Sequence, residues 1–197
     1  SMPNNSNGTT SNNTATTFNV TSPQANYSWY VKCTDNTNNT GFATARTLVI
    51  DSTAPSITLN SPISNYTQNS TNATIFNFTV TDNIFSTTNC SLYLDDILNA
   101  TNNTVANNTA PTFNVSIYGK HNWSILCRDN ANNSVLSAVR NFTNDQVVPV
   151  ISINSPTDGY ITNSTNVTIY NFTATDDVYA TTNCSLYLNS VLNNSNG

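Results

Sequence analysis

Charged side chains are scarce in this chain of 197 residues. They make up 8% of it, against roughly 25% in ordinary soluble proteins. Five Lys and Arg against ten acidic residues leave a net charge of −5, which excludes the basic surface that nucleic-acid binding requires. A single histidine would have to serve any Ser–His–Asp set, so catalysis of that kind is not expected. No apolar run approaches the ~20 residues of a membrane-spanning helix, and the chain does not open on a secretory signal.

Uncharged polar residues take the place of charge. The chain holds 38 Asn, 33 Thr and 22 Ser, so amide and hydroxyl groups must keep its surface soluble. Asn-x-Ser/Thr sequons occur 23 times, roughly double the number, about 11, that this composition gives by chance. The excess predicts N-linked glycans and therefore a secreted protein. The alternative is a solvated surface of Asn and Thr without sugars.

The predicted glycosylation sites lie throughout the chain. They are Asn19, Asn26, Asn65, Asn72, Asn77, Asn102, Asn107, Asn114, Asn122, Asn132, Asn141, Asn166 and Asn171. The alternation of the expected strands places four of these on outward faces, namely Asn77, Asn114, Asn122 and Asn171. A sugar there would not disturb a core, so these four are expected to be exposed and to be glycosylated first.

A repeat of about 94 residues runs through the chain. Cys90 recurs as Cys184, 94 residues later, and residues 55–103 match 149–197 without a gap at 28 of 49 positions. This period is close to the size of one immunoglobulin-like β-sandwich domain.

The repeat is out of phase with the chain. Residues 1–52 are expected to form the C-terminal half of one repeat and 53–148 a complete repeat. Residues 149–197 are then the N-terminal half of the next repeat. The phase predicts either a segment of a longer array or separate subunits that complete one another's fold, and the two remain open at this stage.

The complete repeat breaks into about seven short runs separated by turn residues. In one of them Phe76, Phe78 and Val80 alternate with Asn77 and Thr79, which gives an apolar and a polar face. The other runs are 57–59, 90–94, 113–117, 123–127 and 138–142, with a less regular edge run at 97–98. Helical periodicity is missing over any useful length. The sequence therefore predicts an all-β protein made of tandem β-sandwiches.

The cysteines follow the repeat. Alternation places Cys90 and Cys127 on the inward faces of two strands that are neighbours in such a sandwich, which predicts a disulfide with Trp123 in the core beside it. Two buried free thiols are the alternative. Cys33 and Cys184 are the corresponding residues of the two half repeats. They are expected to bond between neighbouring copies, because the complete repeat stands between them within one chain.

The motif Cys90-Ser91-Leu92-Tyr93, the spacing from Trp123 to Cys127 and the turn at 129–133 together resemble the immunoglobulin-like tandem repeats of archaeal, and some bacterial, cell-surface glycoproteins. The resemblance spans the whole repeat, although this chain has Asn132 where Gly is usual. It implies an immunoglobulin-like or fibronectin-III-like sandwich, an extracellular location at the cell surface, and archaea as the source.

No cofactor is expected apart from covalent N-glycans. Acidic residues do lie at strand ends, where Ca²⁺ can bind between repeats: Asp82, Asp95, Asp96, Asp129, Asp176 and Asp177. They are equally suited to cap turns through their own backbone, and calcium is the less favoured interpretation.

Two functions fit this sequence. The favoured one is a structural subunit or segment of an N-glycosylated surface filament or stalk, whose copies associate head to tail. The alternative is an adhesin, or a carbohydrate- or protein-binding surface module, in which one repeat would carry a distinctive loop. Apart from a one-residue length difference near Pro23, no such loop distinguishes the repeats. Enzymatic activity is not expected.

Overall fold

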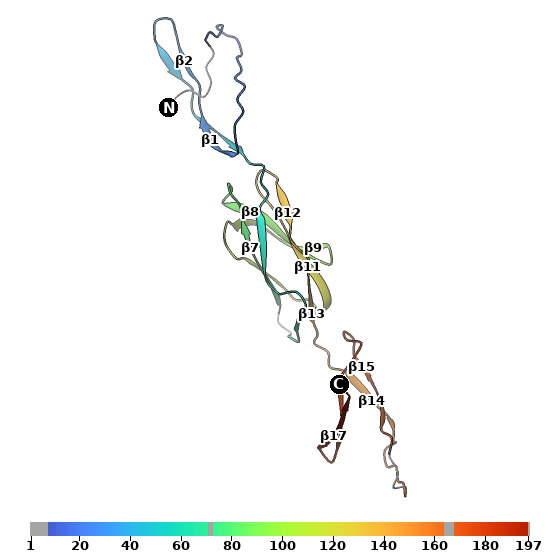
Figure 1. Cartoon of the computed structure of the whole chain (residues 1–197). Helices are drawn as coiled ribbons and strands as arrows, with labels where there is room; N and C mark the ends of the chain where they lie inside the picture. Colours follow the sequence, from blue (N-terminus) through green and yellow to red (C-terminus); the bar gives the residue numbers. More distant parts are fainter. Residues whose placement is uncertain (1–7, 71–72, 164–167, 197) are drawn as a thin grey trace.

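The computed structural model describes residues 8–70, 73–163 and 168–196. Within these ranges all regular structure is β-strand, and there is no helix. Figure 1 shows the strands gathered into three bodies that follow one another along an elongated chain. The all-β prediction is confirmed.

The middle body is a complete sandwich of two sheets. Its strands are β5 (Ser56–Ser61), β6 (Tyr66–Gln68), β7 (Thr74–Thr81), β8 (Thr87–Leu94), β9 (Ile97–Ala106), β10 (Thr112–Val115), β11 (Gly119–Arg128), β12 (Ser134–Leu136) and β13 (Arg140–Asn144). One sheet has the order β10-β7-β5 and the other β6-β13-β11-β8-β9, with β12 paired to β11. Neighbouring strands are antiparallel except β13 and β6.

The core lies between these sheets, and strand alternation explains which side chains form it. On β7, Phe76, Phe78 and Val80 are fully buried, as expected for every second residue of a strand. The Phe76 ring meets Trp123 of β11 and Phe142 of β13 edge-on, at 5.2 Å between centroids in each case. Edge-to-face aromatic pairs of this kind add to the stabilisation that burial alone gives.

The predicted disulfide joins the two central strands of the larger sheet. Cys90 on β8 lies directly opposite Cys127 on β11, and their sulfurs are bonded at 2.09 Å. Both residues are fully buried, and Trp123, on the same strand as Cys127, is buried with them. The pairing predicted from alternation is confirmed.

The strands differ from the sequence prediction at the edges of the larger sheet. The edge run expected at 97–98 is the start of a ten-residue strand, β9. The three-residue strands β6 and β12 were not predicted. They are too short to show a period of two, and they exist because β13 and β11 offer them backbone partners.

The turn after β11 is held by Asp129. Its Oδ1 accepts the backbone N–H groups of Ala131 and Asn133 at 2.8 and 2.9 Å. Between them, Asn132 has a φ of 70°. Asn enters the left-handed region more readily than other residues with a side chain, so it can replace the Gly that is usual there. Asp35 caps the corresponding turn of the first body in the same way.

Two smaller bodies flank the sandwich. The first holds β1 (Ala25–Trp29), β2 (Lys32–Thr34), β3 (Thr40–Phe42) and β4 (Arg46–Ile50), and the third holds β14 (Val150–Ser155), β15 (Asn171–Thr175), β16 (Cys184–Leu188) and β17 (Val191–Asn196). Among the described residues, each contains only two-stranded sheets: β1-β4 and β2-β3, or β14-β15 and β16-β17. Their registers repeat those of the sandwich. Trp29 lies opposite Arg46, as Trp123 lies opposite Arg140.

Candidate interaction surfaces

The first body exposes side chains whose counterparts, 94 residues later, form the core of the sandwich. Trp29 is 45% exposed, whereas Trp123 is 1% exposed. Leu48 is also exposed, whereas its counterpart Phe142 is buried. The local strand pairing is the same in both places. The difference is that, in the described part of the chain, β1 to β4 pair only with one another.

The third body, which corresponds to the N-terminal half of the repeat, shows the same contrast in side-chain exposure. Phe172 on β15 is 39% exposed, whereas its counterpart Phe78 on β7 is fully buried. Tyr170, just before β15, is exposed, and its counterpart Phe76 is buried. Single exposed apolar residues are ordinary, but these stand at positions that are buried in the sandwich, which makes them a candidate interaction surface.

The two exposed faces are complementary. In the sandwich, β8 pairs with β11 in a register that sets Leu94 opposite Trp123 and Cys90 opposite Cys127. The segment with β1 and β2 is the counterpart of β11, and β16 is the counterpart of β8. Each flanking body therefore holds the strand that the other lacks.

The free cysteines belong to these faces. Cys33, on β2, is exposed, and Cys184, at the start of β16, is partly buried; neither is bonded. Their counterparts form the disulfide of the sandwich. The predicted bond between Cys33 and Cys184 of neighbouring copies stays a prediction.

The sequon asparagines divide by exposure. Those with exposed positions are Asn19, Asn26, Asn65, Asn114, Asn122, Asn132, Asn141 and Asn171. Asn77, Asn102 and Asn107 are half-buried, while Asn72 and Asn166 lie outside the described residues.

Asn77 was expected to be exposed, and the structure corrects this. Its Nδ2 donates to the carbonyl oxygens of Ala110 and Pro111, both at 3.0 Å, and its Oδ1 accepts from Asn60 at 2.7 Å. Alternation does point Asn77 away from the core, but the loop before β10 covers that side of the strand. The Asn107 amide is likewise engaged, donating to the carbonyl of Asp82 at 2.7 Å.

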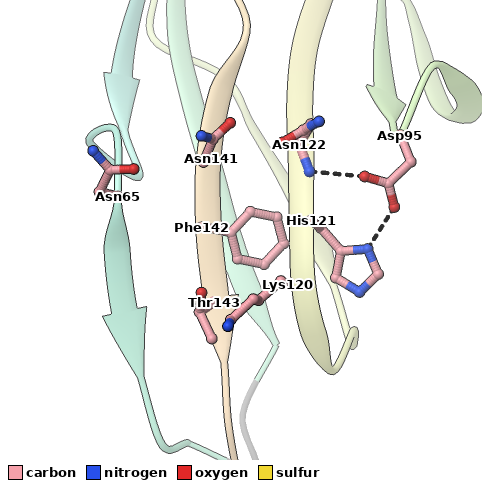
Figure 2. A pocket seen from close by; sticks show the side chains of 8 residues that line it. All are labelled: Asn65, Asp95, Lys120, His121, Asn122, Asn141, Phe142 and Thr143. Atoms are coloured by element: carbon pink, nitrogen blue, oxygen red, sulfur yellow. Dashed lines mark hydrogen bonds and ion pairs between the residues drawn. The ribbon is translucent and has the colours of Figure 1, made fainter. Parts of the chain in front are cut away.

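The single histidine lies beside an open hollow on the larger sheet (Figure 2). His121 Nδ1 is 2.6 Å from Asp95 Oδ2, and its Nε2 is 2.7 Å from the carbonyl oxygen of Tyr118. The backbone N–H of Asn122 donates to the other Asp95 oxygen at 2.8 Å. These contacts hold the β8–β9 turn against β11 and engage both ring nitrogens of His121. His121 is half-buried rather than a simple surface residue.

The pKa of Asp95 is lowered from its usual value of 3.8. The backbone hydrogen bond from Asn122 is the largest cause; burial opposes it, and the hydrogen bond and charge of His121 lower the pKa further. Each donor stabilises the ionised carboxylate more than the protonated one.

Three carboxylates that could hold a metal ion do come together. Asp51, Asp82 and Asp129 each place an oxygen within 4.8 Å of the others'. Asp82 and Asp129 were among the acidic residues noted in the sequence, but Asp51 was missed. Its counterpart Asp145, 94 residues later, is the signal that could have found it. Asp95 and Asp96 take no part in the cluster.

Within the described ranges, no helix could cross a bilayer. Searches with protein-family models and against curated proteins found no match. Among solved structures, the fibronectin(III)-like modules of Clostridium thermocellum CbhA match with a TM-score of 0.40 and 15% identity, over 47% of this chain and 99% of that one. This likeness is too distant to assign a function.

Proposed function

We propose that the chain is a structural subunit or segment of an extracellular, N-glycosylated filament or stalk at the cell surface. The observation that carries the proposal is the pair of exposed, complementary half-sandwich faces, with Trp29 on one and Phe172 on the other. A half sandwich with two-stranded sheets is marginal in water. Each face is therefore expected to be covered by the complementary half of a neighbouring copy or of an adjoining repeat. We expect no enzymatic activity.

The complete repeat supplies the geometry of the contact. Applying its β8–β11 register to the flanking bodies sets Leu188 of one copy opposite Trp29 of the next, and Cys184 opposite Cys33. A contact between two different surfaces extends in a line unless the rotation between copies closes a ring. Figure 1 shows the middle body between the first and third bodies of one chain, which favours pairing between copies over pairing within one.

A disulfide between Cys184 and Cys33 would make this contact covalent. Its formation removes two hydrogens from the two thiols, so it needs an oxidant such as a small-molecule disulfide. Such conditions are found outside the cell and not in most cytosols.

The experiment uses the purified 197-residue chain under mild oxidation with glutathione disulfide. Electrophoresis without reductant should show a ladder of multiples of 21.3 kDa that collapses on reduction. Cys33→Ser and Cys184→Ser chains should each fail to form the ladder. Mixed in equal amounts, they should form dimers and nothing longer, because each retains one half of one bond.

Two outcomes contradict the proposal. One is a wild-type chain that remains monomeric by light scattering at high concentration. The other is a Cys184→Ser chain that still forms the ladder, which would show that the link does not use the predicted pair.

A further inference from the structure

We infer that Asp51, Asp82 and Asp129 form a calcium site where the first body joins the sandwich. Their carboxylates come from three separate segments: the connector after β4, the β7–β8 connection and the β11–β12 turn. One oxygen of each lies within 4.8 Å of the others. An ion held there would fasten the connector to the end of the sandwich and stiffen the junction between repeats.

Two of the three acids each have a carboxylate oxygen that is buried without any hydrogen-bond donor. Oδ2 of Asp51 and Oδ2 of Asp82 are both enclosed and unpartnered. The other oxygen of each carboxylate is occupied, because Thr53 donates to Asp51 Oδ1 and both Ile84 and Phe85 donate to Asp82 Oδ1. These backbone bonds fix the two carboxylates and leave Oδ2 of each as the oxygen free to bind an ion.

The third carboxylate, Asp129, adds a negative charge and offers the other two carboxylates no hydrogen-bond donor. Asp129 is 4% exposed, and its hydrogen bonds come from its own turn. In the part of the chain that the structure describes, none of the three acids pairs with Lys, Arg or His, since the ion pair present joins His121 and Asp95. Enclosed anionic oxygens without a positive partner are costly. A bound cation would offset the repulsion among the three carboxylates and would coordinate the unpartnered oxygens.

The type of ligand and the spacing of the oxygens favour calcium. Carboxylate oxygens suit the hard cations Ca²⁺ and Mg²⁺. Ca²⁺ binds oxygens at 2.3–2.6 Å, so two of its ligands can lie up to about 5 Å apart. The 4.8 Å spread therefore fits it as the cluster stands. Mg²⁺, at about 2.1 Å, demands near-ideal octahedral geometry and keeps several waters, so a cluster of three protein carboxylates suits it less well. Water completes the coordination in either case.

The same acids recur at the next junction. Each has a counterpart 94 residues away: Asp145 for Asp51, Asp176 for Asp82 and Asp35 for Asp129. Asp176 Oδ1 accepts the N–H groups of Val178 and Tyr179, as Asp82 Oδ1 does from its own loop. The acid that would complete this second set lies on the first body. A neighbouring copy would supply it if the proposed assembly holds, whereas the Asp51 site lies within one chain and does not depend on assembly.

Calorimetric titration of the chelator-treated full chain with CaCl₂ tests the inference, together with thermal unfolding in CaCl₂ and in EDTA. Cys33 and Cys184 are replaced by Ser in all samples to prevent disulfide-linked assembly, and light scattering checks that the samples are monomeric. The chain should bind about one Ca²⁺ with a dissociation constant in the 10⁻⁴–10⁻³ M range of extracellular sites, and its melting temperature should rise with Ca²⁺. MgCl₂ at the same concentration should have a much smaller effect.

Asp82→Asn is the critical variant because Asn keeps the Oδ1 acceptor for Ile84 and Phe85. It should weaken Ca²⁺ binding at least tenfold. In EDTA its melting temperature should equal or exceed that of the parent chain, because one repelling charge is gone. The control is Asp177→Asn, an exposed acid whose counterpart is already Asn83; it should leave binding unchanged.

Three results would overturn the site. The first is a parent chain whose heat signal and melting temperature do not respond to Ca²⁺. The second is an Asp82→Asn chain that binds as tightly as the parent. The third is an Asp82→Asn chain destabilised equally in EDTA and in CaCl₂, which would make Asp82 a turn residue only.

Discussion

At the scale of single residues, a substitution in the sandwich can be compared with the same substitution 94 residues away in a flanking body. Phe78→Ala removes a fully buried ring from the sandwich and should lower the free energy of unfolding by about 3–5 kcal/mol. Phe172→Ala, at the counterpart position, should cost less than about 1 kcal/mol in a monomeric chain because that ring is already exposed. Urea denaturation at low concentration, with Cys33 and Cys184 replaced by Ser, measures both. Equal losses would mean that the third body is already covered.

The pH dependence of stability is a second property set by one residue. Because the folded-state pKa of Asp95 lies below 3.8, its hydrogen bonds stabilise the fold above that pH, and this contribution is lost as the pH falls through the folded pKa. Asp95→Asn should therefore lower the urea midpoint at pH 7 but have little effect near pH 2. Asp96→Asn, at the neighbouring exposed position, is the control. A constant difference between wild type and Asp95→Asn at all pH values would contradict this prediction.

Glycan occupancy is also decided residue by residue. Asn114 and Asn122 are exposed, whereas the Asn77 amide nitrogen donates to two carbonyl groups. Attaching a sugar to Nδ2 replaces one of its hydrogens. Peptide mass spectrometry of protein from a glycosylating host should therefore find high occupancy at Asn114 and Asn122 and low occupancy at Asn77. Full occupancy at Asn77 would show that the loop before β10 opens, or that the sugar is attached before folding.

At the scale of elements, the disulfide should be a major source of stability for the sandwich. It closes a loop with a sequence separation of 37 residues, for which chain entropy gives roughly 4 kcal/mol, within a typical range of about 2–5. Cys90→Ala with Cys127→Ala, in a chain already lacking Cys33 and Cys184, should lower the free energy of unfolding by that order. Reducing the four-cysteine chain should give a similar loss. A loss near zero would mean that packing around Trp123 suffices.

The strands of the sandwich also show which structural features can be predicted from the sequence. Phe76, Phe78 and Val80 reveal β7 because a buried face and a polar face alternate, and the cysteine pair follows from the same alternation. The three-residue strands β6 and β12 depend on partner strands far along the chain, so no local pattern marks them. The engagement of Asn77 and the meeting of Asp51 with Asp82 and Asp129 are also tertiary contacts. The sequence placed Asn77 on a strand and Asp82 and Asp129 at strand ends without showing what lies against them, and it did not single out Asp51.

At the scale of the whole molecule, the proposed contact joins two different faces, so a chain with only one of them should stop growth. A fragment of residues 1–148 retains the first body and lacks the third; added to the full chain, it should shorten the assemblies in proportion to its amount, because it accepts a neighbour but offers none. A fragment of residues 53–148 has the sandwich alone and is the matched control. Mass photometry before and after mixing measures the length distribution. If both fragments shorten the assemblies equally, association occurs through the sandwich surface. If 1–148 has no effect, the first body is not the acceptor.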